Sequence, residues 1–260
     1  MKIWTLVENT TCRKDLHPEH GLSLYIETEN RRILFDMGQS AAFAENAAKM
    51  GVDLSAVDTA ILSHGHYDHG GGIEQFLRCN DHAPLYISRY AFEPHCNASG
   101  KYIGLDSNLQ SSGRLVFTEE KCALGENLTL YSCNRNRRHW EKDPAGLEYL
   151  RDGLRCPEDF RHEQYLLVQE GEKRILISGC SHKGICNLTQ WFCPDILIGG
   201  FHLKDRDPDD PDLECIAQTL MGFPTVYYTG HCTGTAQYER LKHIMGDRLR
   251  SFSTGTVQEF

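Results

Sequence analysis

The sequence contains no long apolar run and no excess of positive charge. No stretch reaches the 18 or more apolar residues of a membrane-spanning helix, and the opening residues, MKIWTLVENT, lack the apolar centre of a secretory signal. The 27 lysines and arginines are outnumbered by 36 aspartates and glutamates, and the resulting net charge of -9 argues against a protein that coats nucleic acid or an anionic membrane. We therefore expect a cytoplasmic protein whose partner is a small-molecule substrate, with neither nucleic acid nor membrane involved.

The sequence also lacks a Cys-x-x-Cys pair, which argues against a zinc ribbon or knuckle. Its 11 cysteines are an odd number in a long chain without an export signal, so we expect most of them to be reduced thiols. Cys180 and Cys232 differ from the others because they lie in glycine-containing turns that also carry histidine.

Apolar and alternating runs predict the strands of an α/β protein, and Ala-rich or amphipathic runs predict its helices. In the first half we expect helices at 41–50 and 73–78 and strands at 3–7, 22–28, 32–35, 59–62, 84–88, 114–118 and 128–132. The second and third strands should form a hairpin, and the last two are hairpin-like. Little organisation is expected at 93–113.

The second half repeats the pattern, with strands at 165–169, 174–178, 195–198 and 225–228 and helices at 186–192, 213–221 and 236–245. Residues 134–161 are polar, charged and without a clear period, which predicts an irregular surface segment that we interpret as a lid. Two sheets flanked by helices, forming one αββα sandwich over residues 1–260, fit this order.

One short segment carries most of the chemistry, because it holds three imidazoles and a carboxylate within six residues: His64, His66, Asp68 and His69. These side chains are ligands for zinc, iron or manganese, and the neighbouring glycines permit a tight loop that turns several donors inward. In an extended loop His64 and His66 would point to one side, and Asp68 and His69 could then serve a second metal.

Three later strands end in turns of small residues that carry histidine: Gly179-Cys180-Ser181-His182, Gly199-Gly200-Phe201-His202 and Thr229-Gly230-His231-Cys232-Thr233-Gly234. One loop supplies too few ligands for a zinc site, so these turns are the natural suppliers of the others.

The segment from His64 to His69 resembles the HxHxDH signature of the metallo-β-lactamase superfamily, and the pattern is similar over nearly the whole chain. The resemblance implies the αββα metallo-β-lactamase fold and a site for one or two Zn²⁺ ions, with Fe or Mn as alternatives. It further implies His64, His66 and His162 at the first metal. Asp68, His69 and His231 would then lie at the second.

The resemblance fails at one position, where the family usually has an aspartate that bridges the metals. The strand at 174–178 ends here in Gly179-Cys180. Cys180 could bind the second metal as a thiolate, as in the zinc β-lactamases of the family, or His182 could supply a nitrogen instead. The three turns together resemble a narrower branch, proteins similar to dihydropterin-ribofuranosyl-aminobenzene-phosphate synthase.

This pattern predicts a mono- or dinuclear metallo-hydrolase that uses a metal-activated water on a small-molecule ester, phosphoester or related bond. Asp68 would hold the second metal and accept a hydrogen bond from the water. His202, which has no counterpart in the general signature, is predicted to bind substrate and to stabilise charge on it. The alternatives are a di-iron redox protein of the same fold and a non-catalytic metal- or ligand-binding protein.

Other polar residues carry weaker signals. Glu8, Asn9 and Asp36 follow strands and could either orient a ligating histidine or cap turns. The remaining histidines lie in polar stretches, so we expect them at the surface: His17, His20, His82, His95, His139 and His243.

Overall fold

A computed structural model describes residues 1–141 and 144–260. The chain divides into two compact units. Unit 1 comprises residues 1–119, 143–164 and 253–260, and unit 2 comprises residues 120–142 and 165–252. This division leaves the single domain a prediction. Residues 142 and 143 of the expected lid lie outside the described residues.

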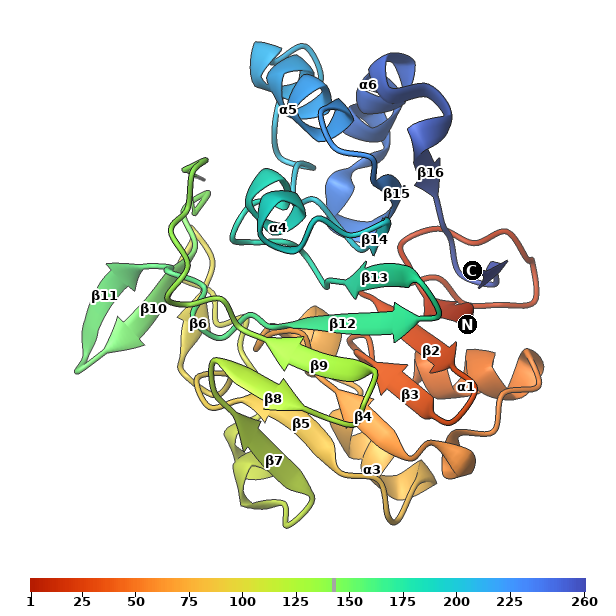
Figure 1. Ribbon diagram of the computed structural model, residues 1–260. Coiled ribbons are helices and arrows are strands. Elements are labelled where there is room, and N and C mark those ends of the chain that lie inside the picture. Colours follow the sequence, from red (N-terminus) through yellow and green to blue (C-terminus); the bar gives the residue numbers. More distant parts are fainter. Residues whose placement is uncertain (142–143) are drawn as a thin grey trace. The chain divides into compact units, whose positions relative to one another are not determined.

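Unit 1 contains a seven-stranded mixed sheet in the order β17-β1-β2-β3-β4-β5-β7 (Figure 1). The predicted hairpin of β2 and β3 is confirmed, with Leu24 opposite Phe35. From β3 onward neighbouring strands are parallel, so β3, β4, β5 and β7 end at the same edge. The strands are Val257–Glu259 (β17), Lys2–Val7 (β1), Ser23–Glu27 (β2), Arg32–Phe35 (β3), Thr59–Ile61 (β4), Leu85–Ser88 (β5) and Leu115–Thr118 (β7).

The helices of unit 1 pack on this sheet through buried apolar side chains. In α1, Phe43 and Ala47 are four residues apart and lie on the buried face, and Gly51 follows the helix with a positive φ of 74°. Ile73 and Phe76 of α3 belong to the same core. The helices are α1 (Ala42–Lys49), α2 (Tyr67–Gly70), α3 (Ile73–Cys79) and two 3₁₀ turns, Leu54–Ala56 and Ser107–Ser111.

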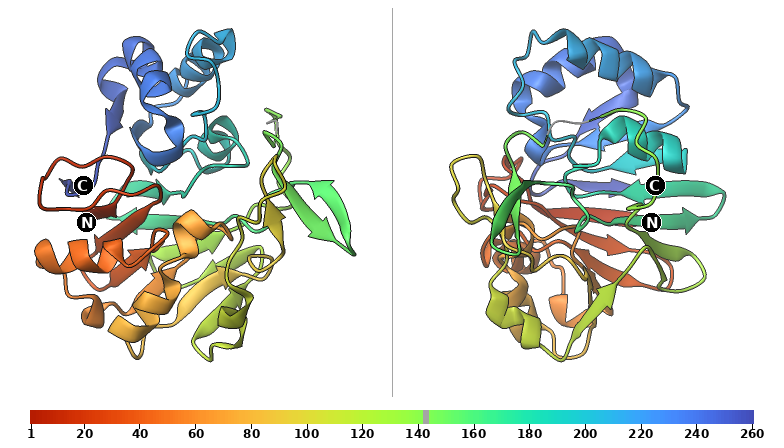
Figure 2. Two further views of the ribbon diagram at one scale, coloured as in Figure 1. Left: turned by 180° about the vertical axis from the view of Figure 1, so that it is seen from behind. Right: turned by 90° about the vertical axis from the view of Figure 1, so that its left-hand side faces the viewer.

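A second, three-stranded sheet in unit 1 was not expected. It has the order β11-β10-β6, with strands Leu154–Pro157, Glu148–Arg151 and His95–Cys96. The expectation of irregular backbone is therefore wrong for part of 134–161, and part of 93–113 is organised as well. The β10–β11 hairpin (green) extends away from the seven-stranded sheet of unit 1 (Figure 2). The register of this hairpin is set by pairing across a tight turn. Because its strands have no apolar period, the sequence does not predict them.

Unit 2 also contains a seven-stranded sheet, in the order β16-β15-β14-β13-β12-β9-β8. The strands β13, β14, β15 and β16 are parallel neighbours, so they too end at one edge. Their bounds are Lys121–Ala123 (β8), Leu128–Tyr131 (β9), Tyr165–Glu170 (β12), Lys173–Ile177 (β13), Ile196–Ile198 (β14), Val226–Thr229 (β15) and Leu249–Ser251 (β16).

The helices of unit 2 share one apolar core with this sheet, represented by Leu188, Leu220 and Leu241 from three helices and Leu176 and Tyr227 from two strands. All three predicted helices are confirmed: α4 (Ile185–Phe192), α5 (Pro211–Met221) and α6 (Thr235–Met245). In α5 the Asp210 carboxylate accepts the N–H of Asp212, and Pro211 occupies the first turn, which is how a helix start is stabilised. Two 3₁₀ turns, His231–Thr233 and Gly246–Arg248, complete the unit.

One strand pairing differs from the prediction. The strands at 114–118 and 128–132 are not a hairpin, because β7 pairs with β5 in unit 1 and β9 pairs with β8 and β12 in unit 2. The short strand β8, between them in sequence, is the true hairpin partner of β9, and it was too short to give a period.

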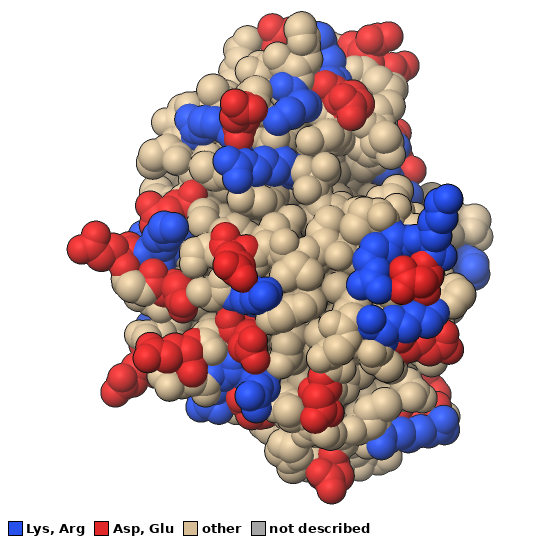
Figure 3. Space-filling model, turned by 90° about the vertical axis from the view of Figure 1, so that its right-hand side faces the viewer, with Lys and Arg blue, Asp and Glu red and all other residues tan. Residues whose placement is uncertain are grey.

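The surface shown in Figure 3 carries Lys and Arg side chains interspersed with Asp and Glu. Exposed ion pairs, such as that of Arg89 with Glu119, each contribute little to stability in water. Among the described residues, no helix is long and apolar enough to cross a membrane.

Gln164, the last residue of unit 1 before β12, ties together the strand ends that position the histidine loop. Its buried side-chain amide donates to the carbonyl oxygen of Leu62 at 2.7 Å and accepts from the hydroxyl of Thr118 at 2.6 Å. Its backbone N–H donates to the carbonyl oxygen of Ser63 at 2.8 Å. One side chain therefore fixes the residues immediately before His64.

We expect Gln164→Leu to lower the free energy of unfolding by about 1–3 kcal/mol, because the buried carbonyl oxygen of Leu62 loses its amide donor and the Thr118 hydroxyl keeps only its contact with the carbonyl oxygen of Ile87. Chemical denaturation monitored by circular dichroism measures the change. Gln169→Leu, an exposed glutamine on β12, should stay within about 0.5 kcal/mol of the unsubstituted protein. Equal effects of the two substitutions would refute this role of Gln164.

Candidate metal centre

The histidine loop of unit 1 begins where β4 ends, next to the end of β3. Asp36 directly follows β3 and has a left-handed backbone with φ of 59°, a conformation that aspartate tolerates better than most residues. Its N–H donates to the carbonyl oxygen of Ile61 in β4. The two parallel strand ends thus bring the Asp36 carboxylate beside Ser63 and the residues that follow it.

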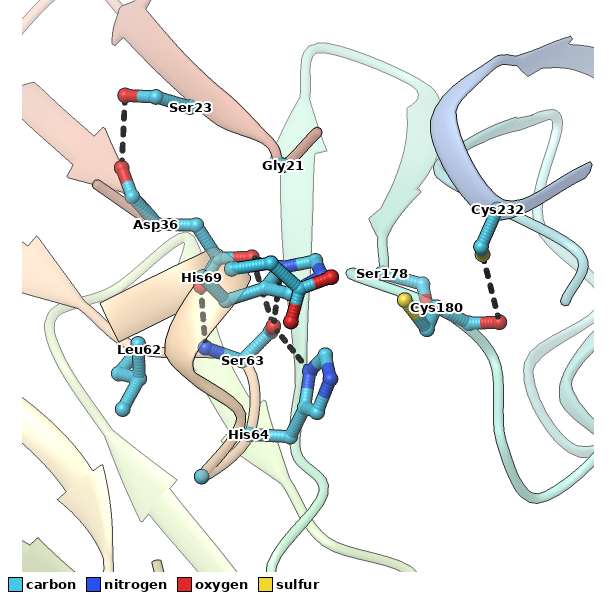
Figure 4. A network of polar contacts seen from close by, with 12 residues as sticks. Gly21, Ser23, Asp36, Leu62, Ser63, His64, His69, Ser178, Cys180 and Cys232 are labelled. Carbon is cyan, nitrogen blue, oxygen red and sulfur yellow. Dashed lines mark hydrogen bonds and ion pairs between the residues drawn. The ribbon is translucent and has the colours of Figure 1, made fainter. Parts of the chain in front are cut away.

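Asp36 is fully buried and accepts three hydrogen bonds from this loop (Figure 4). The backbone N–H of Ser63 donates to one carboxylate oxygen at 2.6 Å. The Ser63 hydroxyl and His69 Nδ1 lie 2.7 and 2.6 Å from the other oxygen. Three charge-assisted hydrogen bonds offset the cost of burying this carboxylate.

These contacts fix the proton positions of two histidines. His69 must carry its proton on Nδ1 to donate to Asp36, so its Nε2 presents a lone pair. The Ser63 hydroxyl donates to Asp36 and can accept only from a protonated Nδ1 of His64, which lies 2.8 Å away. His64 Nε2 is therefore also left as a lone pair, the form that binds a metal.

His66 lies beside His64 in the same buried loop, with ring centroids 4.6 Å apart. Burial, together with the nearby His95 imidazole, lowers the pKa of His66 to about 3. His66 is therefore neutral at physiological pH. The loop is not extended throughout as expected, since Asp68 and His69 lie on the single-turn helix α2.

Asp68 has a histidine partner that the sequence did not reveal. His20 Nε2 lies 3.2 Å from its carboxylate, and His69 Nε2 lies 3.9 Å from the same oxygen. The His20 side chain is 40% exposed, so it is at the surface as expected, but it contacts a predicted ligand.

Gly65 gives the loop its close packing. A side chain there would lie 2.1 Å from the carbonyl oxygen of Ala91, so only glycine fits. Its N–H donates to Nδ1 of His162 at 2.9 Å. A neutral imidazole that accepts through Nδ1 carries its proton on Nε2. The structure thus brings His162 to the His64 loop, with its centroid 5.1 Å from that of His66, and its role as a metal ligand stays a prediction.

His95 was expected at the surface, and this prediction is wrong. It is fully buried at the start of β6, and its ring stacks at 4.0 Å on that of His162. Its Nδ1 lies 2.8 Å from the buried carboxylate of Glu158, which is 63 residues away in sequence. Neither residue lies in a periodic or glycine-rich motif, so the sequence carried no signal for the pair. His17, His82, His139 and His243 are exposed as predicted.

In unit 2, the three histidine-bearing turns follow the adjacent parallel strands β13, β14 and β15, which places them at one edge of the sheet. Each turn contains a non-glycine residue with a left-handed backbone: Ser181, His202 and His231, with φ between 50° and 55°. Such conformations cost about 1–3 kcal/mol each and cluster at functional sites.

The thiol of Cys232 joins these turns. Its sulfur accepts the backbone N–H of His202 at 3.2 Å and faces the carbonyl oxygen of Cys180 at 3.7 Å (Figure 4). A side chain at Gly200 would lie 2.3 Å from this sulfur, so the second turn reaches the third only because residue 200 is glycine.

Two groups of donor side chains result in unit 2. Cys180, His231 and Cys232 are buried, and one donor atom of each lies within 4.8 Å of those of the other two. The rings of His182 and the half-buried His202 lie 4.3 Å apart. The structure therefore brings all four predicted residues of unit 2 to one sheet edge. Their division between metal and substrate stays a prediction.

Asp36, Glu8 and Asn9, the polar residues that follow strands, make different kinds of contact. Asp36 orients a histidine. The Glu8 carboxylate accepts the N–H and hydroxyl of Thr10, and Asn9 accepts the N–H of Gly21, contacts that stabilise loops. Turn capping thus describes these contacts of Glu8 and Asn9.

The donor chemistry of unit 1 fits a divalent transition metal. Two imidazole lone pairs are fixed by one carboxylate, a third imidazole is neutral, and Asp68 adds an anionic oxygen. Nitrogen and carboxylate ligands with ordered outer partners are the usual environment of zinc.

We expect Asp36→Asn to weaken Zn²⁺ binding by about 10–100-fold, because the amide offers only one acceptor and its NH₂ opposes a donor of Ser63 or His69. Competition with a chromophoric chelator measures the affinity. Asp53→Asn, at an exposed 3₁₀ cap where the amide oxygen can still accept from Ser55, should bind Zn²⁺ normally. Normal affinity in the Asp36 variant would show that the histidine tautomers do not depend on this carboxylate.

Comparison with known proteins identifies the family. The chain matches the metallo-β-lactamase superfamily over residues 17–237. It is 29% identical to an uncharacterized protein of Methanocaldococcus jannaschii, over 92% of this chain and 93% of the relative. It is also 29% identical to the 7,8-dihydropterin-6-methyl-4-(β-D-ribofuranosyl)-aminobenzene-5′-phosphate synthase of that organism, over 90% and 88%.

A solved structure is similar over the full length. Tm1679, a metal-dependent hydrolase of the β-lactamase superfamily, aligns with a TM-score of 0.85 at 26% identity and covers 100% of this chain and 99% of its own. Both the family match and this alignment extend over most of the chain. The protein belongs to the metallo-β-lactamase superfamily and has its α/β fold.

Proposed function

We propose that this protein is a metal-dependent hydrolase that cleaves an ester, phosphoester or related bond of a small molecule. The observation that carries the proposal is the Asp36 network, which holds His64 and His69 in the tautomer that binds a metal. Histidines that bind a metal almost always donate their other ring N–H to such a partner, so this network supports a metal site.

The proposed ligands follow the family pattern on residues present in this chain. His64 and His66 would hold one ion, and His162, the candidate third ligand, would bind through Nδ1 in place of its contact with the Gly65 N–H. Asp68, His69 and His231 would hold the other. At least one of Cys180 and His182 takes the place of the bridging aspartate: a thiolate there favours zinc, whereas an imidazole leaves the site open to iron or manganese.

A bound divalent metal of this kind supplies Lewis acidity and a water that is acidic enough to act as nucleophile near neutral pH. The chain's own residues bind and orient the substrate. The backbone of His202 is fixed by the Cys232 sulfur and its ring is only half-buried. It can donate a hydrogen bond to a substrate oxygen on which negative charge develops.

Two relatives support different parts of this proposal. Tm1679 is described as a hydrolase, which supports hydrolysis. The named relative from Methanocaldococcus jannaschii is a 5′-phosphate synthase, which supports phosphoesters as the first substrates to test. Its name also makes group transfer a second reaction class to test.

The proposal predicts that protein purified without chelator contains Zn²⁺, Fe or Mn and hydrolyses at least one member of a panel of phosphodiesters, phosphomonoesters, thioesters and lactones. Chelation should abolish the activity because the nucleophile depends on the metal, and added Zn²⁺ should restore it. Elemental analysis and chromogenic assays provide the measurements.

Asp68→Ala serves as the inactive variant, and His243→Ala, an exposed histidine on α6, is the matched control with unchanged rate. Oxygen or nitric oxide consumption by an iron-loaded protein that hydrolyses nothing would instead establish the redox alternative. Metal-free protein with full hydrolytic activity would refute the proposal.

His202→Ala should lower turnover by about 100-fold, the usual effect of removing a donor that stabilises charge on the substrate, while bound metal stays unchanged. His202→Gly separates the role of the ring from backbone strain, because glycine accepts the left-handed φ of 51° without cost. The two variants should lose the same turnover. Loss of metal in both would reassign His202 to the metal.

A further inference from the structure

Behind the His64 loop, unit 1 contains a second buried carboxylate with two imidazoles, formed by Glu158, His95 and His162. All three side chains are at most 1% exposed. Glu158 directs one carboxylate oxygen to His95 Nδ1 at 2.8 Å and the other towards His162 Nε2 at 3.6 Å. The second oxygen also accepts the N–H of Phe160 at 2.9 Å.

The hydrogen bonds of this group determine its proton positions. His95 donates from Nδ1 to Glu158, so its Nε2 is a lone pair. This nitrogen is buried and has no hydrogen-bond partner. His162 accepts the Gly65 N–H on Nδ1 and so carries its proton on Nε2, on the side of Glu158. An unpaired buried lone pair is costly and indicates an acceptor whose donor is supplied by a neighbour.

His66 is the neighbour in position to supply that donor. One ring nitrogen of His66 lies within 4.8 Å of one of His95, and both are buried. The two rings are nearly perpendicular, with centroids 5.6 Å apart. Two imidazoles joined edge to edge through an N–H···N hydrogen bond have centroids about 5 Å apart, so the separation suits this contact after a small adjustment.

We propose that His95 and Glu158 are positioning residues for the metal ligand His66: His95 Nε2 accepts the proton of one His66 nitrogen, and Glu158 holds His95 in the accepting tautomer. The other nitrogen of His66 is thereby left as the metal-binding lone pair. This inference rests on the proposed function, because it assumes that His66 binds a metal.

As in the Asp36 network, a buried carboxylate would orient a ligating histidine, but here it would do so through one more imidazole. There the carboxylate orients His69 directly and His64 through a hydroxyl. Here Glu158 acts on His66 through His95. An acceptor at the outer nitrogen of a ligating histidine fixes the ring and raises its basicity, and loss of such a partner typically costs 10–100-fold in metal affinity.

The competing interpretation of the same cluster is an additional metal ion held by His66, His95 and His162. A metal there would change the number of ions bound, whereas a positioning role changes only their affinity.

The test measures Zn²⁺ binding to the full chain by competition with a chromophoric chelator. We expect His95→Phe to weaken Zn²⁺ binding by about 10–100-fold without changing the stoichiometry. His95→Gln should recover most of the affinity, since its amide can donate to Glu158 and accept from His66. Glu158→Gln should weaken binding in the same direction. The matched control is His82→Phe, in an exposed imidazole–carboxylate pair with Asp81.

Thermal unfolding of the metal-free variants separates a structural role from a positioning role. Equal affinity for His95→Phe and the unsubstituted protein overturns the inference, as does equal weakening in His95→Phe and His95→Gln. Loss of one bound Zn²⁺ in His95→Phe also overturns it, in favour of an additional metal ion bound by His95 itself. An unsubstituted protein that binds Zn²⁺ but hydrolyses nothing refutes the hydrolase proposal alone, and one that binds no Zn²⁺ refutes both.

Discussion

The buried carboxylate of Asp36 is the constraint on which the histidine loop depends. A charge in this environment is costly unless it is fully hydrogen-bonded, and Asp36 meets that requirement with a backbone N–H, a hydroxyl and an imidazole N–H from one short segment. The loop therefore cannot change its conformation without leaving the carboxylate unpaired. These contacts, together with the hydrogen bond between the Ser63 hydroxyl and His64, also determine which nitrogen of His64 and of His69 is available.

The location of this network follows from the strand order. Because β3, β4, β5 and β7 are parallel, residues far apart in sequence reach one edge of the sheet, and Gln164 fastens the backbone there. Unit 2 achieves the same with β13, β14 and β15, whose three turns are joined by the thiol of Cys232. A hydroxyl or a larger residue at 232 would alter the distances that Gly200 and His202 now accommodate.

The sequence predicted those parts of the structure that depend on local pattern. Most strands and helices follow from apolar periods, and the residues of the dense motif and the three glycine-bearing turns could be selected because their ligands are close in sequence. Local pattern cannot reveal a partner 63 residues away, and so the sequence predicts His95 at the surface and gives no signal for Glu158. The sequence does not predict the β10–β11 hairpin or β8 either, because short strands with mixed polarity have no measurable period.

In the centre that we propose, the residues of the HxHxDH motif are only part of the site, because two buried carboxylates, Asp36 and Glu158, would orient their imidazoles. A metal-ligating histidine almost always has a hydrogen-bond partner at its other ring nitrogen, and in the centre that we propose Asp36, directly after β3, and Glu158 would supply such partners. Each carboxylate is anchored by a backbone N–H, of Ser63 or of Phe160, in addition to its imidazole. Amide substitutions at Asp36 and Glu158 should therefore change metal affinity through the proton positions of the imidazoles rather than through the shape of the loop. For this reason they test the role of the two carboxylates more directly than removal of the proposed ligands does.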